Sequence, residues 1–92
     1  MRRLLRWFQR RKAVANRDRA AIRRALAYFQ AGRKIAPMGA HIVRREADHL
    51  VVRVMYFTNH IPPDRAWYAV PDEDVAIREL SFADAGDTAP WR

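Results

Sequence analysis

The core of this protein can be located from one stretch, LVVRVMYFT at residues 50–58, in which Arg53 is the single charged residue. β-Branched and aromatic residues dominate the stretch, and these favour β-strands. Successive side chains of a strand point to opposite faces of a sheet. The even-numbered positions from 50 to 56 and the odd-numbered positions from 51 to 57 therefore lie on different faces, and both sets are apolar apart from Arg53. A half-solvated antiparallel sheet has one polar face, so here we expect both faces to need a cover.

Three further strands are predicted around this one. Period-two patterns bounded by Gly, Pro, Asn and Asp residues predict strands at 41–46, 65–70 and 75–81. Successive strands are separated by short turns or loops, which favours antiparallel neighbours. We therefore predict a four-stranded antiparallel β-meander over residues 41–81.

The N-terminal part predicts two helical segments. The first, residues 1–15, opens with MRRLLRWFQRRK, a basic and amphipathic stretch in which apolar residues lie opposite arginines. The second, residues 16–32, has Asn16 as a candidate N-cap and Gly32 as a candidate C′ residue. Its apolar residues recur at helical spacing from Ile22 to Phe29.

These segments predict a single small α+β domain over residues 1–92. One or two N-terminal α-helices pack on the four-stranded antiparallel β-meander, and residues 83–92 form a flexible C-terminal tail. The second helix can cover one sheet face. The other face has three candidate covers: the N-terminal amphipathic helix, the tail with Trp91, or a second copy of the chain or another protein partner. The residues predicted to form this assembly face are Val51, Met55, Phe57 and Trp67.

Charge is unevenly distributed along the chain. The net charge is +8. Residues 1–34 hold twelve Arg or Lys against one acid, Asp18, which gives +11, while residues 35–92 hold six against nine, which gives −3. Such asymmetry indicates an anionic partner for the N-terminal part, or its partial neutralisation by the acidic half.

We expect a non-enzymatic binding protein that contacts an anionic surface, either nucleic-acid phosphates or a membrane interface. Trp7 and Phe8 would insert into the membrane or stack on bases. The location expected is cytoplasmic, with the inner face of a membrane as the alternative. A plain protein-interaction subunit without an anionic ligand is a second hypothesis. The predicted charge donors are Arg3, Arg6, Arg10, Arg11, Lys12, Arg17, Arg19, Arg23 and Arg24.

Catalytic chemistry has little material in this sequence. The chain has no cysteine, Ser81 is the single serine, and no Gly-rich phosphate loop is present. The three histidines are spaced by eight and eleven residues, which does not match metal-ligand spacing. We predict no catalytic residue, no metal, no cofactor and no small-molecule substrate.

Arg53 is the exception, because a buried arginine needs a partner. We predict that it pairs with Glu46 or Glu79 across the sheet. The alternative is that Arg53, with Arg45, Tyr56 and His60, lines a site. Such a group on an antiparallel sheet behind basic helices resembles the small RelE-like ribonuclease toxins in size, charge and element order, and this implies a ribonuclease as a third hypothesis.

Overall fold

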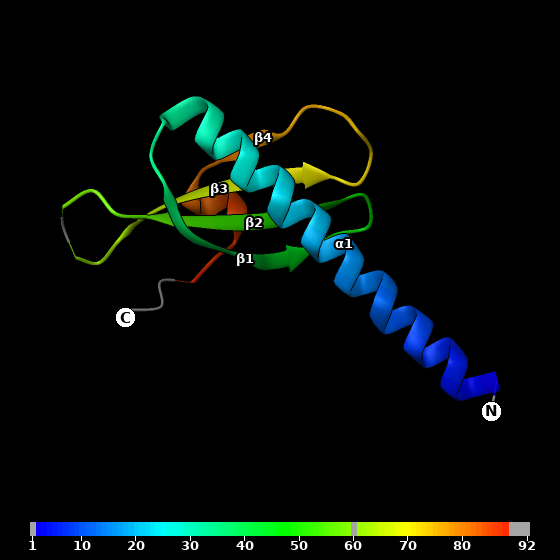
Figure 1. The fold of residues 1–92 in the computed structure, drawn as a ribbon. Helices are drawn as coiled ribbons and strands as arrows, with labels where there is room; N and C mark the ends of the chain where they lie inside the picture. The colour runs from blue at the N-terminus through cyan, green and yellow to red at the C-terminus, as the bar shows by residue number, and fades with distance from the viewer. Residues whose placement is uncertain (1, 60, 89–92) are drawn as a thin grey trace.

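The computed structural model describes residues 2–59 and 61–88, with side chains from residue 5 onward. One long helix lies across one face of a four-stranded sheet (Figure 1). The elements in chain order are α1 (Arg2–Arg33), β1 (Pro37–Arg45), β2 (His49–Tyr56), β3 (Asp64–Pro71), β4 (Arg78–Leu80) and α2 (Phe82–Ala85).

The sheet has the order β1-β2-β3-β4, and each neighbouring pair is antiparallel. This confirms the predicted α+β meander. The strand boundaries differ at the two edges, because β1 begins at Pro37 and β4 is limited to Arg78–Leu80. Residues 72–75 form a bend after β3, closed by a hydrogen bond from the Val75 amide to the Glu73 carbonyl, so the strand predicted at 75–81 starts later.

The core lies between α1 and one face of the sheet. From α1, Ala21, Ala25 and Phe29 are buried, with Ala25 fully inaccessible to solvent. They pack with residues at even-numbered positions of β2 and β3, so this is the face of the central strand that α1 covers. Two alanines on this side of α1 let the helix backbone approach the sheet closely, and the larger side chains come from the strands. The sheet residues of this cluster are Leu50, Val52, Val54, Tyr56, Ala66, Tyr68 and Val70.

The predicted break between two N-terminal helices is wrong. Residues 2–33 form one continuous α-helix, and Asn16 lies inside it on an exposed position. No Gly or Pro occurs before Gly32, and one interior Asn costs a helix only about 0.7 kcal/mol relative to Ala. The helix also ends later than predicted. Lys34, with φ of 54°, adopts the left-handed conformation that ends it, and its amide bonds to the Gln30 carbonyl at 3.1 Å.

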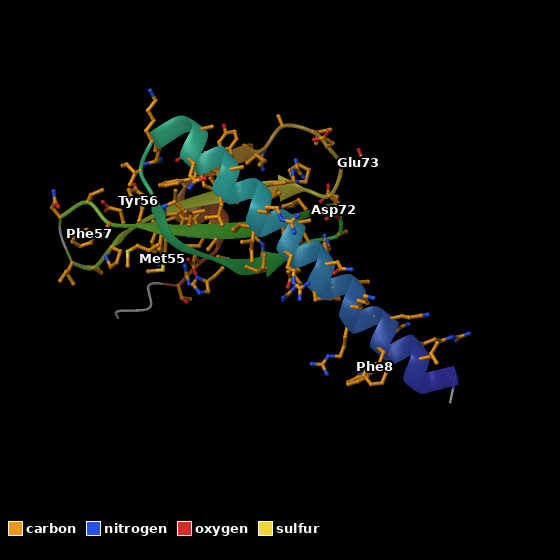
Figure 2. All side chains as sticks on the ribbon, in the orientation of Figure 1. Phe8, Met55, Tyr56, Phe57, Asp72 and Glu73 are labelled. Atoms are coloured by element: carbon orange, nitrogen blue, oxygen red, sulfur yellow. The ribbon has the colours of Figure 1, made fainter. Side chains whose placement is uncertain are left out.

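Residues 2–14 of α1, here called the overhang, extend beyond the sheet (Figure 1). All side chains from residue 5 to residue 14 are exposed. The overhang therefore does not cover the second face of the sheet, which overturns that sequence-based candidate. Figure 2 shows Phe8 on the overhang, at the opposite end of the molecule from Met55 and Phe57.

The second sheet face is partly covered by the C-terminal segment instead. Ser81 caps α2 by accepting a hydrogen bond from the Asp84 amide at 3.1 Å, and Gly86 ends α2 with φ of 67°. Phe82 lies 5.4 Å from Trp67, centroid to centroid, in an edge-to-face contact. Part of the predicted tail therefore forms the helical turn α2, while residues 89–92, including Trp91, lie outside the described residues.

Candidate anion-binding surface on α1

The arginines of α1 fall into two groups, and the first group holds the fold together. Arg17 forms a two-point ion pair with Asp72, at 2.7 Å from Nε and 2.9 Å from Nη2. It also donates to the carbonyls of Glu46 and His49. The hydrogen bond that Arg17 donates to the Asp72 carboxylate raises the pKa of Arg17. Arg24 donates to the Pro71 carbonyl and, at 2.9 Å, to the Val75 carbonyl.

Arg17 and Arg24 thus attach α1 to one end of the sheet, formed by the turn between β1 and β2 and by residues 71–75 after β3; we call it the sheet end. Both were predicted as charge donors to an outside surface, and the structure places their guanidinium groups on the protein's own backbone and carboxylates. The same holds for Arg33, which bonds the Tyr56 hydroxyl at 2.8 Å and Glu79 at 2.9 Å. Arg45 reaches the single acid of α1, Asp18, at 2.6 Å. The acidic half therefore neutralises part of the helix charge.

The second group has no such partners. Among the described residues, five cations of α1 are exposed and make no hydrogen bond or ion pair with their side chains. Arg11 is also exposed and stacks its guanidinium 4.8 Å from the Trp7 ring. The side chain of Arg3 lies outside the described residues. The five are Arg6, Arg10, Lys12, Arg19 and Arg23.

Helical spacing places these side chains around α1. Each residue turns the helix by 100°, so Arg23, two positions before the buried Ala25, points away from the sheet. Lys12 and Arg19 lie on nearly the same row as Arg23, at spacings of seven and four residues. Arg6 and Arg10 lie on the opposite flank. We call the side that carries Lys12, Arg19 and Arg23 the outer side of α1.

Trp7 and Phe8, predicted to insert or stack, are 49% and 60% exposed. Their rings contact each other edge to face, with centroids 5.1 Å apart. Trp7 lies 18 residues before Ala25, which is five whole turns, so it faces the same side as the core residues of α1. The structure therefore separates Trp7 from the outer basic row.

The predicted assembly face is largely occupied within one chain. Val51 is fully buried, and the Trp67 indole donates to Asp87 at 2.8 Å. Met55 is half-buried. Phe57 is 51% exposed and lies beyond the end of β2.

Arg53 has a partner, although not one of the two predicted. Its Nη1 lies 3.0 Å from Asp87 Oδ2, because α2 brings Asp87 beneath the second face. Glu46 pairs with Arg44 at 2.6 Å, and Glu79 is bonded to Arg33. Burial alone would raise the pKa of Asp87, but hydrogen bonds from Trp67 and Arg53 outweigh it and lower this pKa. This pairing gives the ribonuclease hypothesis no support.

Asp87 and α2 were missed from the sequence, although a signal was present. Ser81 followed three residues later by Asp84 matches the capping-box pattern, and Gly86 is a typical residue after a helix end. The single turn of helix that results is enough to direct Asp87 under β2. The pattern is short and lies close to the end of the chain, where order is least expected.

No histidine contributes to a metal site among the described residues, since no group of three or more His, Asp or Glu side chains converges there. His49 Nδ1 lies 2.7 Å from Asp48, and His60 lies outside the described residues. None of the helices in the described part of the chain is long and apolar enough to cross a bilayer. No protein-family model, curated protein or solved structure matches this chain.

Proposed function

We propose that this protein binds nucleic-acid phosphates through the outer side of α1. The observation that carries the proposal is the division of the arginines. Those that face the sheet are bonded within the protein, whereas Lys12, Arg19 and Arg23 are exposed and lack partners among the described residues. Exposed Arg and Lys side chains supply the phosphate contacts that dominate nucleic-acid affinity. A cytoplasmic location fits this role.

A nucleic acid fits this surface better than a bilayer does. An interfacial helix needs an apolar face that enters the lipid between its basic flanks. Gln9, Ala13, Asn16 and Ala20 on the outer side are small or polar, while the large apolar residues Leu5 and Phe8 both lie before Lys12. From Lys12 to Arg23, where the basic residues are, the outer side carries no large apolar side chain. Trp7 faces the corner between the overhang and the sheet end, which a flat bilayer cannot enter without meeting the sheet.

The test compares two variants that lower the net charge by the same two units. Arg19→Gln with Arg23→Gln changes the proposed surface, and Lys34→Glu replaces one exposed cation elsewhere by an acid. Affinity for short duplex DNA and single-stranded RNA is measured between about 50 and 300 mM salt, where each lost phosphate contact reduces the slope of log K against log salt by about 0.7–0.9. We expect Arg19→Gln with Arg23→Gln to bind more weakly and to reduce the slope of log K against log salt by the equivalent of about two phosphate contacts. The control variant should keep the affinity and the slope of the wild-type protein.

Vesicles of phosphatidylserine and phosphatidylcholine form a parallel arm of the experiment. Vesicle binding without nucleic-acid binding would replace the proposal by a membrane function. Equal losses of affinity in Arg19→Gln with Arg23→Gln and in Lys34→Glu would mean that net charge, and not this surface, attracts the ligand. Absence of binding to all three probes would leave the protein-interaction subunit as the better hypothesis.

A further inference from the structure

The inner side of the overhang is an apolar surface without a cover. Val14 lies eleven residues before Ala25, close to three whole turns, so Val14 and Trp7 continue the stripe that packs on the sheet. Beyond the sheet end this stripe meets solvent, and Trp7 and Val14 are 49% and 47% exposed. Exposed apolar surface continuous with a core stripe is typical of an interface.

A hollow lies at the same end of the molecule on the other sheet face. Its volume is about 610 Å³, and its apolar lining includes Ala69, Pro71, Val75 and Ala76. Ala69 pairs with Val51 in the register of β2 and β3, which places the floor of the hollow on the second face, opposite α1. α2 leaves this end of the face open. We call this surface the hollow.

Acidic side chains rim the hollow. Asp48, Asp72 and Glu73 line it, Asp74 follows Glu73 directly in the chain, and Arg78 is the one arginine of the lining. Asp48 exposes 89% of its side chain, and Glu73 and Asp74 are exposed and make no ion pair within the described residues. Figure 2 shows Asp72 and Glu73 at the end of the sheet where α1 leaves it. The overhang, in contrast, contains no acid, so the two surfaces have complementary charge.

The overhang cannot reach the hollow of its own chain. α1 is straight and lies on the first face, whereas the hollow opens on the second (Figure 1). The overhang can reach the hollow of a second copy instead. A two-fold axis that lies in the plane of the sheet, perpendicular to the strands and at their ends, places a second copy end to end with the first and turns its sheet over. Each overhang then lies against the second face of its partner's sheet. Such a contact is self-complementary and closed.

We propose that a second copy of this chain covers the overhang, and that each overhang packs its Trp7–Val14 stripe into the hollow of its partner. Arg10 and Arg11 flank this stripe and meet the acidic rim. Direct pairing of the two overhangs is disfavoured because basic side chains lie on both flanks of each stripe. The outer side of α1 stays exposed in this dimer, so the inference does not depend on nucleic-acid binding.

The first test is the mass of the protein in solution, measured by sedimentation across a concentration series. The wild-type chain should sediment at twice the monomer mass of 10.8 kDa. Trp7→Asp should sediment as a monomer. Leu5→Asp is the matched control, because Leu5 is 63% exposed on the outer side of the same helix turn, and it should remain a dimer. A wild-type monomer, or a dimer that survives Trp7→Asp, would overturn the proposal.

The second test uses complementation. Ala76 is exposed in the hollow, so Ala76→Arg should block it and give a monomer whose overhang is intact. Mixing Ala76→Arg with Trp7→Asp leaves one intact overhang and one intact hollow, and the mixture should form a heterodimer that neither variant forms alone. Two variants that stay monomeric when mixed would show that overhang and hollow are not partners. Circular dichroism of each variant excludes unfolding as the cause.

Discussion

Asp87 connects three side chains at one point of the second sheet face. It accepts hydrogen bonds from Trp67 and Arg53, and Arg65 Nη1 lies 3.7 Å away. The Asp87 side chain is only 6% exposed and that of Arg53 18%. A buried ion pair of this kind adds little net stability over an apolar pair, but removal of one partner leaves a buried charge, which costs about 3–5 kcal/mol.

This geometry predicts a pH-dependent effect of Asp87→Asn. The folded-state pKa of Asp87 is lowered, so its contribution is present above the unfolded pKa of about 3.9 and is lost as pH falls through the folded value. We expect Asp87→Asn to cost about 3 kcal/mol at neutral pH. The difference from wild type should shrink below pH of about 4. Urea unfolding of both proteins, from neutral pH to below a pH of about 4, measures this difference in the free energy of unfolding.

Asp84→Asn serves as the control, since Asp84 is exposed and its side chain makes no ion pair among the described residues. It should change the free energy of unfolding little at any pH. A pH-independent difference for Asp87→Asn would mean that the ionised carboxylate is not what Arg53 and Trp67 require.

At the scale of elements, α1 is attached to the sheet by a few polar contacts as well as by its apolar stripe. Arg17 makes four of the hydrogen bonds between α1 and the sheet end. The carbonyls that accept from Arg17 belong to Glu46, in the turn after β1, and to His49, the first residue of β2, while Asp72 follows β3. One side chain therefore fixes two neighbouring loops to one helical position.

Arg17→Ala is predicted to destabilise the fold by about 1–3 kcal/mol, because its hydrogen bonds to Asp72 and to the partly buried Glu46 carbonyl are lost. Arg19→Ala, two residues along the same helix, removes an exposed arginine without partners and should change stability by less than about 0.5 kcal/mol. Thermal and urea unfolding of the two variants gives this comparison directly. Similar losses for both would indicate that helix charge, and not the Arg17 contacts, determines stability.

The sequence predicted the elements better than their boundaries. The run of β-branched and aromatic residues in LVVRVMYFT located β2. Its two apolar faces followed because successive side chains of a strand point to opposite sides. The boundary at Asn16 was wrong because a capping residue type also occurs inside long helices, where its cost is small. Gly32 was a plausible helix end, but the left-handed residue is Lys34, since the chain turns toward β1 two residues later.

For the candidate site, the sequence predicted only that the N-terminal third of the chain is basic. It could not show which of these arginines bond to the sheet and which stay exposed. Arg17 and Arg24 became distinct from Arg19 and Arg23 only when helix phase and the carbonyls of the sheet end were known. Asp87 was unpredictable as the partner of Arg53 because the contact spans 34 residues and depends on the single turn of α2.

At the scale of the whole molecule, α1 presents different chemistry on its two sides. Where α1 packs on the sheet, its inner side forms part of the core. On the overhang, the inner side carries the Trp7–Val14 stripe that we propose docks on a second copy. The outer side carries the exposed cations Lys12, Arg19 and Arg23. In the proposed dimer, two outer sides belong to one particle, so the number of phosphate contacts per bound particle rises with dimerisation.

The two proposed uses of α1 should therefore separate by substitution. Arg19→Gln with Arg23→Gln should weaken nucleic-acid binding and leave the sedimentation mass at the dimer value, because neither residue touches the stripe or the hollow. Trp7→Asp should give a monomer that still binds, with the salt slope reduced by up to about half because one outer side is lost per particle. If Trp7→Asp instead removed all binding at low salt, Trp7 itself would contact the nucleic acid, and the assignment of the two sides of α1 would be reversed.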